Sequence, residues 1–331
     1  MSPPPLRKRL KRFVRYLLIR ALLVPVQLLP LRFASWLGEQ LGALGFVLAR
    51  GERKKALASL AVAWPEKTDA ERLALARACF RHLGRQVLEM VCIEQFDARR
   101  HEYVEWEPAS RAAMDAARAR GKGVVFVTGH FGNWELLARY VALEDYPAAV
   151  IGKEASDPRT TKLIEGFRTS GKLRVIWRGS SGAAKEMLRA LKSNAILGLL
   201  IDQDTKVQSV WVPFFGRLAK TPRAAADLAL RTGAAPMLGF CTRLGPLRYR
   251  ITMRELPLPA LEGEAAVTAL TADFTRGIEE QIRQHPEQWV WMHQRWKSPP
   301  PAELQGPPST PASASPASGS TTGAGVKGGG S

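Results

Sequence analysis

The fold is decided by one stretch of the sequence, residues 124–135, which is Val124-Val125-Phe126-Val127-Thr128-Gly129-His130-Phe131-Gly132-Asn133-Trp134-Glu135. Its first residues are apolar or β-branched and lie between Gly123 and Gly129, which is typical of a short strand buried on both faces in an α/β sheet. Gly129 and Gly132 allow a sharp turn, and a helix is predicted from about Asn133. His130 is therefore expected at the end of a buried strand, beside the start of a helix.

His130 and Glu135 are the candidate catalytic pair. In a regular helix with about 100° per residue, their side chains would point about 140° apart, but a sharp turn through the glycines removes this obstacle. The helix start near Gly132 and Asn133 offers backbone N–H groups to an anionic substrate atom. A base, a carboxylate that orients it and N–H donors for an oxyanion are the groups that acyl transfer needs. On the spacing alone, a structural histidine beside a surface glutamate is the simpler explanation.

The six residues from His130 to Glu135 resemble, letter for letter, the signature block of the bacterial lipid A late acyltransferases, part of the glycerolipid acyltransferase group that shares H-x4-D/E. The resemblance implies an α/β sandwich with a mixed, mostly parallel sheet flanked by helices. It also implies transfer of a fatty acyl group from acyl carrier protein to a hydroxyl of a lipid A precursor, without a metal or redox cofactor. His130 would be the general base, and Glu135 would hold its imidazole.

After this block the sequence alternates between strands and helices, as in βαβ units. One predicted helix begins at Asp157-Pro158 and ends at Gly171, and another begins with Thr221 as N-cap and Pro222 at the first helical position. Further strands are predicted over residues 148–153, 175–177, 195–201, 236–241 and 247–254, and further helices over 183–192 and 265–284.

Arg168, Asp202 and Asp204 are predicted to bind the substrate. Arg168 falls in the last turn of the helix that begins at Pro158, where the resembled family carries a required arginine, and its planar guanidinium suits a phosphate of the acceptor. Asp202 and Asp204 follow a buried strand, at the rim where α/β sheets place ligand groups. Asp202 is expected to hold Arg168 or the acceptor, and Asp204 is the second choice. Two carboxylates are too few ligands to argue for a metal.

The two ends of the chain differ in composition from the middle. Residues 1–31 are predicted to form a basic and apolar membrane anchor, residues 32–297 an acyltransferase domain, and residues 298–331 a disordered Pro/Ser/Gly-rich tail. Within the domain, a helical cap covers about 32–100 and an α/β core about 101–297. The aromatic and basic residues 285–296 match the final block of the same family, and core packing explains them as well as contact with substrate does.

The N-terminus points to an anionic membrane. The net charge is +18, no acidic residue precedes Glu39, and residues 21–31 are apolar except for Gln27. Eleven residues reach only about 16 Å of the roughly 30 Å hydrocarbon core, so an anchor that lies in or dips into the inner leaflet is favoured over a full span. The positive charge places the basic end on the cytoplasmic side, and the family resemblance implies the inner membrane, in contact with its phospholipids, with the catalytic domain on the cytoplasmic side.

Two alternatives remain open at this stage. The acceptor could be another glycolipid or a lysophospholipid, with coenzyme A as the acyl carrier. A non-enzymatic basic protein that binds nucleic acid would also explain the charge, but the sequence carries no zinc finger or RNA-binding motif, so no nucleic-acid partner is predicted. Cys79, Cys92 and Cys241 lack metal or disulfide spacing and are predicted to be small core residues.

Overall fold

The computed structural model describes residues 13–304 apart from 15, 18–20, 22, 156 and 181. Contacts divide the chain into Met1–Pro299 and Pro300–Ser331, and the described part of the second unit contains one 3-10 turn, η2 (Ala302–Leu304). Most of the basic residues of the predicted anchor, and most of the predicted tail, lie outside the described residues. The fold described below is that of the first unit.

A mixed, mostly parallel seven-stranded sheet forms the centre of this unit, as predicted. Its strand order is β1-β9-β8-β2-β5-β3-β4, and only β8 and β9 pair antiparallel. All five residues of β2 are buried, and β2 pairs with β5 on one side and β8 on the other. The strands are β1 (Val104–Trp106), β2 (Val124–Thr128), β3 (Ala148–Lys153), β4 (Arg174–Arg178), β5 (Ile196–Leu200), β8 (Ala235–Gly245) and β9 (Arg248–Glu255).

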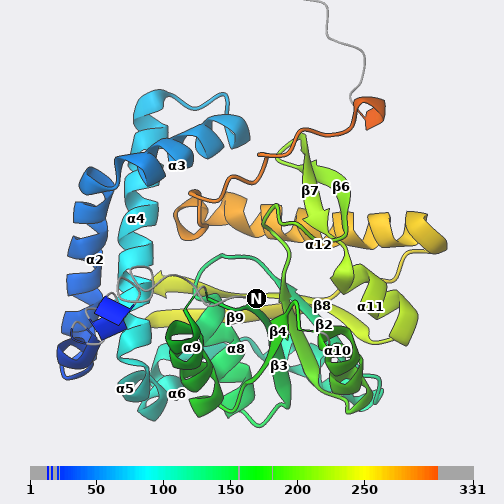
Figure 1. Ribbon diagram of the computed structural model, residues 1–331. Coiled ribbons are helices and arrows are strands. Elements are labelled where there is room, and N and C mark those ends of the chain that lie inside the picture. The colour runs from blue at the N-terminus through cyan, green and yellow to red at the C-terminus, as the bar shows by residue number, and fades with distance from the viewer. Residues whose placement is uncertain are drawn as a thin grey trace, which may run out of the picture. The chain divides into compact units, whose positions relative to one another are not determined.

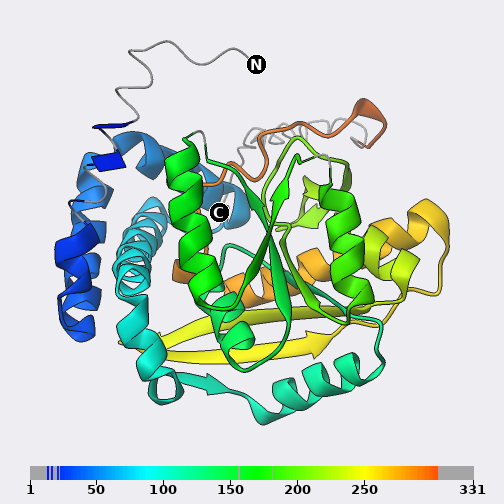
Figure 2. The same ribbon diagram turned by 60° about the horizontal axis from the view of Figure 1, so that its bottom comes forward.

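Helices cover both faces of the sheet, and β2 shows which helices share a face. Val125 and Val127 belong to the apolar cluster that includes residues of α10 (Ala183–Lys192), α11 (Ala224–Thr232) and α12 (Gly263–Gln284). Val124 and Phe126 belong to the cluster with α7 (Pro108–Ala119) and α8 (Trp134–Leu143), against which α9 (Pro158–Ser170) also packs. Figure 1 shows α12 above β8 and β9, and Figure 2 shows α7 on their other side. Because successive side chains of a strand point to opposite faces of the sheet, the residues of β2 contribute to both apolar clusters.

The helices before the sheet are α2 (Leu31–Leu48), α3 (Arg50–Ala63), α4 (Asp69–Val91), α5 (Ile93–Ala98) and α6 (Arg100–Tyr103). α2 and α4 lie side by side (Figure 1), and a Cβ atom added to Gly38, Gly42 or Gly84 would clash with the backbone of the other helix. The glycines therefore permit the close helix contact. Thr68 and Glu71 form a capping box at the start of α4, and Cys79, Cys92 and Cys241 are buried.

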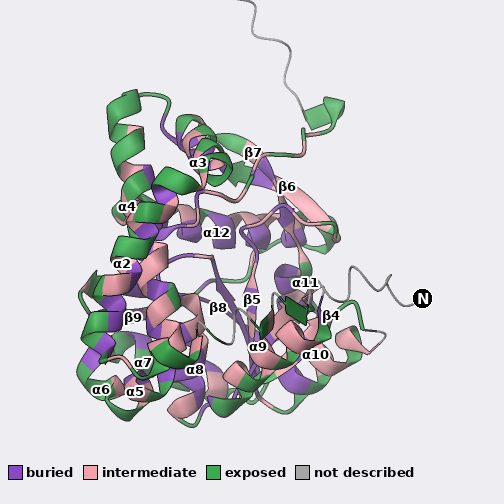
Figure 3. Cartoon of the chain, turned by 60° about the vertical axis from the view of Figure 1, so that its left-hand side comes forward, coloured by how far each residue is buried: buried purple, intermediate pink, exposed green. Residues whose placement is uncertain are grey.

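The face of α2 opposite α4 is exposed (Figure 3), and most of its side chains are apolar. Within the part of the chain that the structure describes, no helix is long and apolar enough to cross a bilayer. The exposed side chains that share this face retain 46 to 69% of their accessible surface, and they are Phe33, Trp36, Leu41, Leu44, Val47 and Leu48.

The prediction of a helix that starts at Thr221-Pro222 is wrong. Both residues belong to β7 (Arg217–Pro222), which pairs antiparallel with β6 (Ser209–Phe214), and Thr221 lies opposite Val210. Phe215 and Gly216 connect the two strands with φ angles of 51° and 71°, as a tight hairpin turn requires. Pairing with the preceding strand of the same hairpin thus overrides the local cap signal, and α11 begins at Ala224.

Candidate active site

The turn after β2 is fixed by hydrogen bonds to two other segments. The N–H of Gly132 donates to the carbonyl of Gln288 and the N–H of Asn133 to that of Cys241, both at 2.9 Å. Gly132 has a φ of 56°, and a Cβ atom there would clash with the Cys241 carbonyl, so the position requires glycine. Asn133 caps α8, because its side-chain oxygen accepts the N–H of Leu136 at 3.0 Å. The N–H groups of Gly132 and Asn133, predicted to contact substrate, are thus used within the protein.

His82 supports the same turn from α4. Its Nε2 lies 3.2 Å from the carbonyl oxygen of Gly132 and donates to it. Burial and the nearby charge of Arg243 lower the pKa of His82 to about 3, so the ring is neutral at neutral pH. His82 is therefore a core residue that stabilises the turn through this hydrogen bond.

His130 is held by Asp202 rather than by Glu135, which corrects the predicted pairing. The Nδ1 of His130 lies 2.7 Å from one carboxylate oxygen of Asp202, and the backbone N–H of His130 donates to the other at 2.6 Å. The indole N–H of Trp289 donates to that second oxygen at 2.7 Å. Burial alone would raise the pKa of the Asp202 carboxyl, but the charge and hydrogen bonds of His130 and the Trp289 hydrogen bond hold it well below its usual range. An ionised carboxylate on Nδ1–H leaves the Nε2 lone pair of His130 free to accept a proton.

The sheet register explains this pairing. β2 and β5 are parallel neighbours, and Thr128 at the end of β2 lies opposite Leu200 at the end of β5. His130 and Asp202 each stand two residues beyond those positions, so they emerge together at the same edge of the sheet. Asp202 is fully buried, whereas the side chain of His130 keeps 22% of its surface exposed and remains within reach of a substrate.

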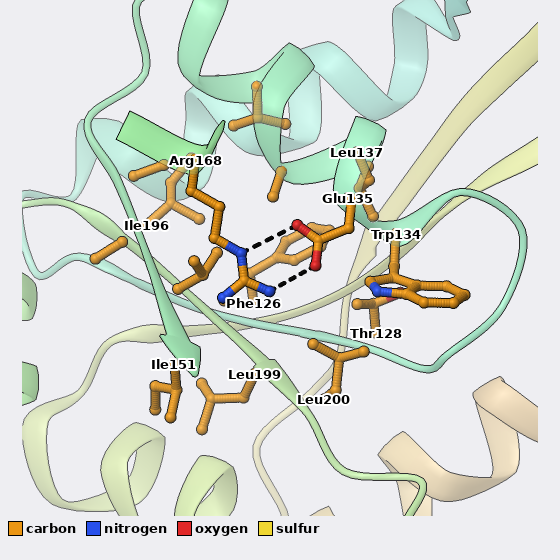
Figure 4. A pocket seen from close by; sticks show the side chains of 16 residues that line it. Phe126, Thr128, Trp134, Glu135, Leu137, Ile151, Arg168, Ile196, Leu199 and Leu200 are labelled. Atoms are coloured by element: carbon orange, nitrogen blue, oxygen red, sulfur yellow. Dashed lines mark hydrogen bonds and ion pairs between the residues drawn. The ribbon is translucent and has the colours of Figure 1, made fainter. Parts of the chain in front are cut away.

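Glu135 is paired with Arg168 instead (Figure 4). The Nε and Nη2 of Arg168 donate to the two carboxylate oxygens of Glu135 at 3.1 and 2.5 Å. Both side chains are mostly buried, so this is a bidentate ion pair in a desolvated environment. Arg168 occupies the last turn of α9 as predicted, but its expected contact with Asp202 is replaced by the pair with Glu135.

Asp204 stands apart from this arrangement. Its carboxylate accepts the backbone N–H of Ser298 at 3.0 Å, and its carbonyl oxygen accepts the ammonium of Lys297 at 2.7 Å. Asp204 thus ties the end of the first unit to the segment that follows β5. The structure gives it an anchoring contact rather than a position beside His130 or Arg168.

Gln203 and His293 lie beside His130, although neither was among the predicted site residues. The side-chain nitrogen of Gln203 lies 3.2 Å from Nε2 of His130 and 2.6 Å from Nε2 of His293. Burial, with the charge of His130, lowers the pKa of His293 to about 4. The sequence placed Gln203 inside the D-x-D segment and His293 inside the C-terminal aromatic block, but no local pattern brings these segments together. The structure confirms core packing for part of that block, since Trp289 and Trp291 are buried, and it places His293 against His130, while substrate contact stays a prediction.

Two apolar spaces meet at the Glu135–Arg168 ion pair. A narrow pocket lies between α8 and strands β2, β3 and β5, with Phe126, Ile151 and Leu199 among its lining residues (Figure 4). A wider groove lies between α4 and α9 and is lined by Val87, Met90 and Phe167, among others. Trp134, Glu135 and Arg168 line both spaces. The ion pair thus lines both a narrow apolar pocket and a wider apolar groove.

The model of the bacterial lipid A biosynthesis acyltransferase family matches residues 5–298 of the chain. The chain belongs to this family. The chain is 26% identical over 285 residues to the lipid A biosynthesis palmitoleoyltransferase of Escherichia coli strain K12, and the alignment covers 83% of this chain and 88% of that protein. It is 26% identical over 273 residues to the lipid A biosynthesis lauroyltransferase of the same strain, covering 80% and 85%.

Similarity extends to another group of acyltransferases. The phosphatidylinositol mannoside acyltransferase of Mycobacterium tuberculosis strain CDC 1551 / Oshkosh is 25% identical over 187 residues, covering 55% of this chain and 57% of that protein. The family and these relatives support a lipid acyltransferase. The names of these relatives give different acceptors, lipid A in one group and phosphatidylinositol mannoside in the other.

Proposed function

We propose that the protein transfers a fatty acyl group from an acyl carrier protein thioester to a hydroxyl of a lipid A precursor. The observation that carries the proposal is the His130–Asp202 pair, because a buried carboxylate fixes the tautomer of a histidine whose other nitrogen is accessible. Family membership supplies the reaction class. Coenzyme A as carrier and a mannosylated phosphoinositide as acceptor are the alternatives.

In the proposed reaction, His130 Nε2 takes the proton of the acceptor hydroxyl while the oxygen attacks the thioester carbon. Asp202 stabilises the imidazolium that forms, which is the part that the sequence had given to Glu135. The protonated His130 then returns its proton to the leaving thiolate. The Glu135–Arg168 ion pair, which lines both the pocket and the groove, would position the substrate between them.

The two apolar spaces suit two acyl chains. A fatty chain gains about 0.8 kcal/mol for each CH₂ group that leaves water, so the narrow apolar pocket beside the Glu135–Arg168 pair would stabilise the chain of a bound donor. The open groove between α4 and α9 is accessible from the surface and suits an acceptor that already carries chains. Each chain would then reach the ion pair from a different side.

The direct test is a transfer assay with purified protein. Detergent-dispersed lipid A precursor is offered with acyl carrier protein thioesters or with coenzyme A thioesters, and products are identified by mass spectrometry. We expect a mass increase of one acyl group on the lipid A precursor with the carrier-protein donor. Acylation of a mannosylated phosphoinositide but not of lipid A precursor would instead support the second acceptor class.

Arg168 provides a test of acceptor recognition. Its Nε–H and one Nη2–H are engaged by Glu135, which leaves the N–H groups of Nη1 and the second N–H of Nη2 for a phosphate of the acceptor. Arg168→Ala should therefore raise KM for the phosphorylated acceptor and also release Glu135, whereas Arg168→Lys should rescue only partly, because lysine lacks the planar fork. The measurement compares phosphorylated with dephosphorylated acceptor. Equal losses with both acceptors would rule out a phosphate contact and leave Arg168 as a partner of Glu135 alone.

We also propose that the protein lies on the inner membrane through the N-terminal residues and the exposed face of α2. Aromatic and aliphatic side chains on one helix face, combined with a net charge of +18, fit an anionic lipid surface. Deleting residues 1–30 should lower binding to anionic vesicles, and adding Trp36→Gln and Leu44→Gln should lower it further. Fractionation in low salt, high salt and detergent measures this. Complete release of the full-length protein by salt alone would show that apolar insertion contributes nothing, because salt weakens only the electrostatic part.

A further inference from the structure

The side-chain amide of Gln203 lies between two imidazoles at the reacting end of His130. Its nitrogen is 3.2 Å from His130 Nε2 and 2.6 Å from His293 Nε2, and the two rings are tilted by 75° with centroids 4.8 Å apart. A primary amide nitrogen carries two hydrogens, so it can donate to both rings at once. In the neutral base form of His130, whose Nδ1–H donates to Asp202, Nε2 is an acceptor, and the nitrogen of Gln203 rather than its oxygen faces it.

Substrate binding changes this arrangement. Nε2 of His130 has one lone pair, and the acceptor hydroxyl must occupy it before the proton can be transferred. The N–H of Gln203 that pointed at Nε2 then loses its partner, while the second N–H stays with His293. An unpaired donor is left beside the carbon that is attacked. Protonation of Nε2 completes the change, since an imidazolium nitrogen cannot accept a hydrogen bond at all.

Several N–H groups near His130 already donate hydrogen bonds within the protein, so they are not free to stabilise an oxyanion. The N–H groups of Gly132 and Asn133 donate to the carbonyls of Gln288 and Cys241, and that of Leu136 donates to the Asn133 side chain. The indole N–H of Trp289 donates to Asp202. Gln203 differs from these groups, because the substrate hydroxyl must replace one of its two hydrogen bonds, the one made to His130 Nε2.

We propose that Gln203 is a further catalytic residue, which donates a hydrogen bond to the oxyanion, and that His293 is the positioning residue that holds its amide. The inference rests on the proposed acyl transfer. The acceptor oxygen forms a bond to the thioester carbon, its proton moves to His130 Nε2, and the carbonyl electron pair moves to oxygen, where the N–H of Gln203 stabilises it. The electron pair then re-forms the carbonyl, the C–S bond breaks, and the thiolate takes the proton from His130.

His293 is built to hold an amide in place. Its backbone N–H donates to the carbonyl of Val290 at 3.1 Å, and its carbonyl accepts the hydroxyl of Ser59 at 3.3 Å. The aromatic segment around it is buried, with Trp289 and Trp291 fully enclosed. Burial keeps the ring neutral, with a pKa of about 4, so Nε2 is available as an acceptor at neutral pH. A neutral, immobile acceptor fixes one N–H of Gln203 and leaves the other directed at the reaction centre.

The test compares Gln203→Ala and Gln203→Glu with Gln208→Glu, which makes the same chemical change at an exposed position five residues away. Loss of one oxyanion donor lowers kcat by about 10²–10³-fold in other enzymes, so we expect a loss of this order in both Gln203 variants, with KM for the acyl carrier protein thioester within about threefold. The Gln208 variant should match the wild type. Thermal unfolding of each variant shows whether the fold is retained.

His293 is tested by two substitutions and a double mutant. His293→Phe keeps a ring but removes the acceptor, and it should lose most of what Gln203→Ala loses. His293→Asn offers an amide oxygen to Gln203 and should recover part of the rate. The Gln203→Ala/His293→Phe double variant should be no slower than Gln203→Ala, because both changes remove one interaction. Multiplied losses would overturn the positioning assignment.

The outcomes separate this inference from the proposed function. A wild-type protein that transfers acyl groups, together with a Gln203→Ala variant within threefold of it, overturns the role of Gln203 and leaves the function intact. A wild-type protein that transfers no acyl group from either thioester overturns both. A loss in kcat that appears in Gln203→Glu but not in Gln208→Glu, with an unchanged unfolding temperature, supports the role of the amide.

Discussion

His130→Ala should lower kcat for acyl transfer by about two to four orders of magnitude, the usual contribution of a general base. The substitution removes the acceptor for the hydroxyl proton. Binding should change little, since the apolar pocket and groove are formed by other residues. Steady-state kinetics with saturating acyl carrier protein thioester measures the loss.

The fold should survive this substitution. The backbone N–H of residue 130 and the indole of Trp289 would still donate to Asp202, so the buried carboxylate keeps two of its partners. Thermal unfolding and near-UV circular dichroism provide the control. A folded His130→Ala protein with nearly wild-type activity would contradict the proposed mechanism.

Asp202→Asn should be about as damaging as His130→Ala. Asparagine has the shape of aspartate, but its amide can present N–H to Nδ1 of His130, which moves the ring proton to Nε2 and removes the base. Loss of the carboxylate also removes the charge that stabilises the imidazolium. We expect kcat to fall at least about a hundredfold with little change in KM.

Glu135→Gln is the matched control for Asp202→Asn, because it makes the same chemical change in the carboxylate that pairs with Arg168. We expect its loss in kcat to be at least about tenfold smaller, since Glu135 does not contact the imidazole. The opposite ranking, with Glu135→Gln severe and Asp202→Asn mild, would restore Glu135 as the residue that orients His130.

Asp202 also gives the stability of the protein a pH dependence of defined sign. The pKa of its carboxyl is lowered in the folded state, so the unfolded chain takes up a proton first as the pH falls. The stabilisation is present above the unfolded pKa, about 4, and is lost as the pH falls toward the lower folded pKa. Asp202→Asn should flatten the unfolding temperature over this acid range. An unchanged slope would show that the carboxylate is not held in its ionised form.

The strand, turn and helix that carry His130 could be predicted from the sequence. The side-chain contacts between distant segments, such as that of His130 with Asp202, could not. β2, the turn at Gly132 and the start of α8 are encoded within residues 124–135, and the Pro158 and Gly171 signals define α9. Asp202 and His130 meet only because β5 is inserted between β2 and β3 in the sheet. That strand order depends on packing over the whole unit, so the shared motif favoured the nearer carboxylate, Glu135.

Residues from the C-terminal segment show the same limit. Sequence placed His293 among aromatic residues that suit a core, and the structure confirms that neighbouring tryptophans are buried. Its position beside Gln203 depends on the folding of residues 285–296 against the turn after β2, where Phe131 and Trp289 form an isolated bridge. No periodicity or cap signal carries such information.

The close contact of α2 with α4 bears on which hydroxyl can be acylated. No side chain separates these helices at Gly38 and Gly42, and α4 reaches the turn after β2 through the hydrogen bond of His82 to Gly132. If α2 rests on the lipid surface, the height of His130 above the bilayer is set by rigid packing rather than by a flexible tether. An acceptor hydroxyl at another depth of the glycolipid would then stay out of reach, even when its chemistry is identical. Selection among chemically equivalent hydroxyls would thus depend on their distance from the membrane surface compared with that of His130.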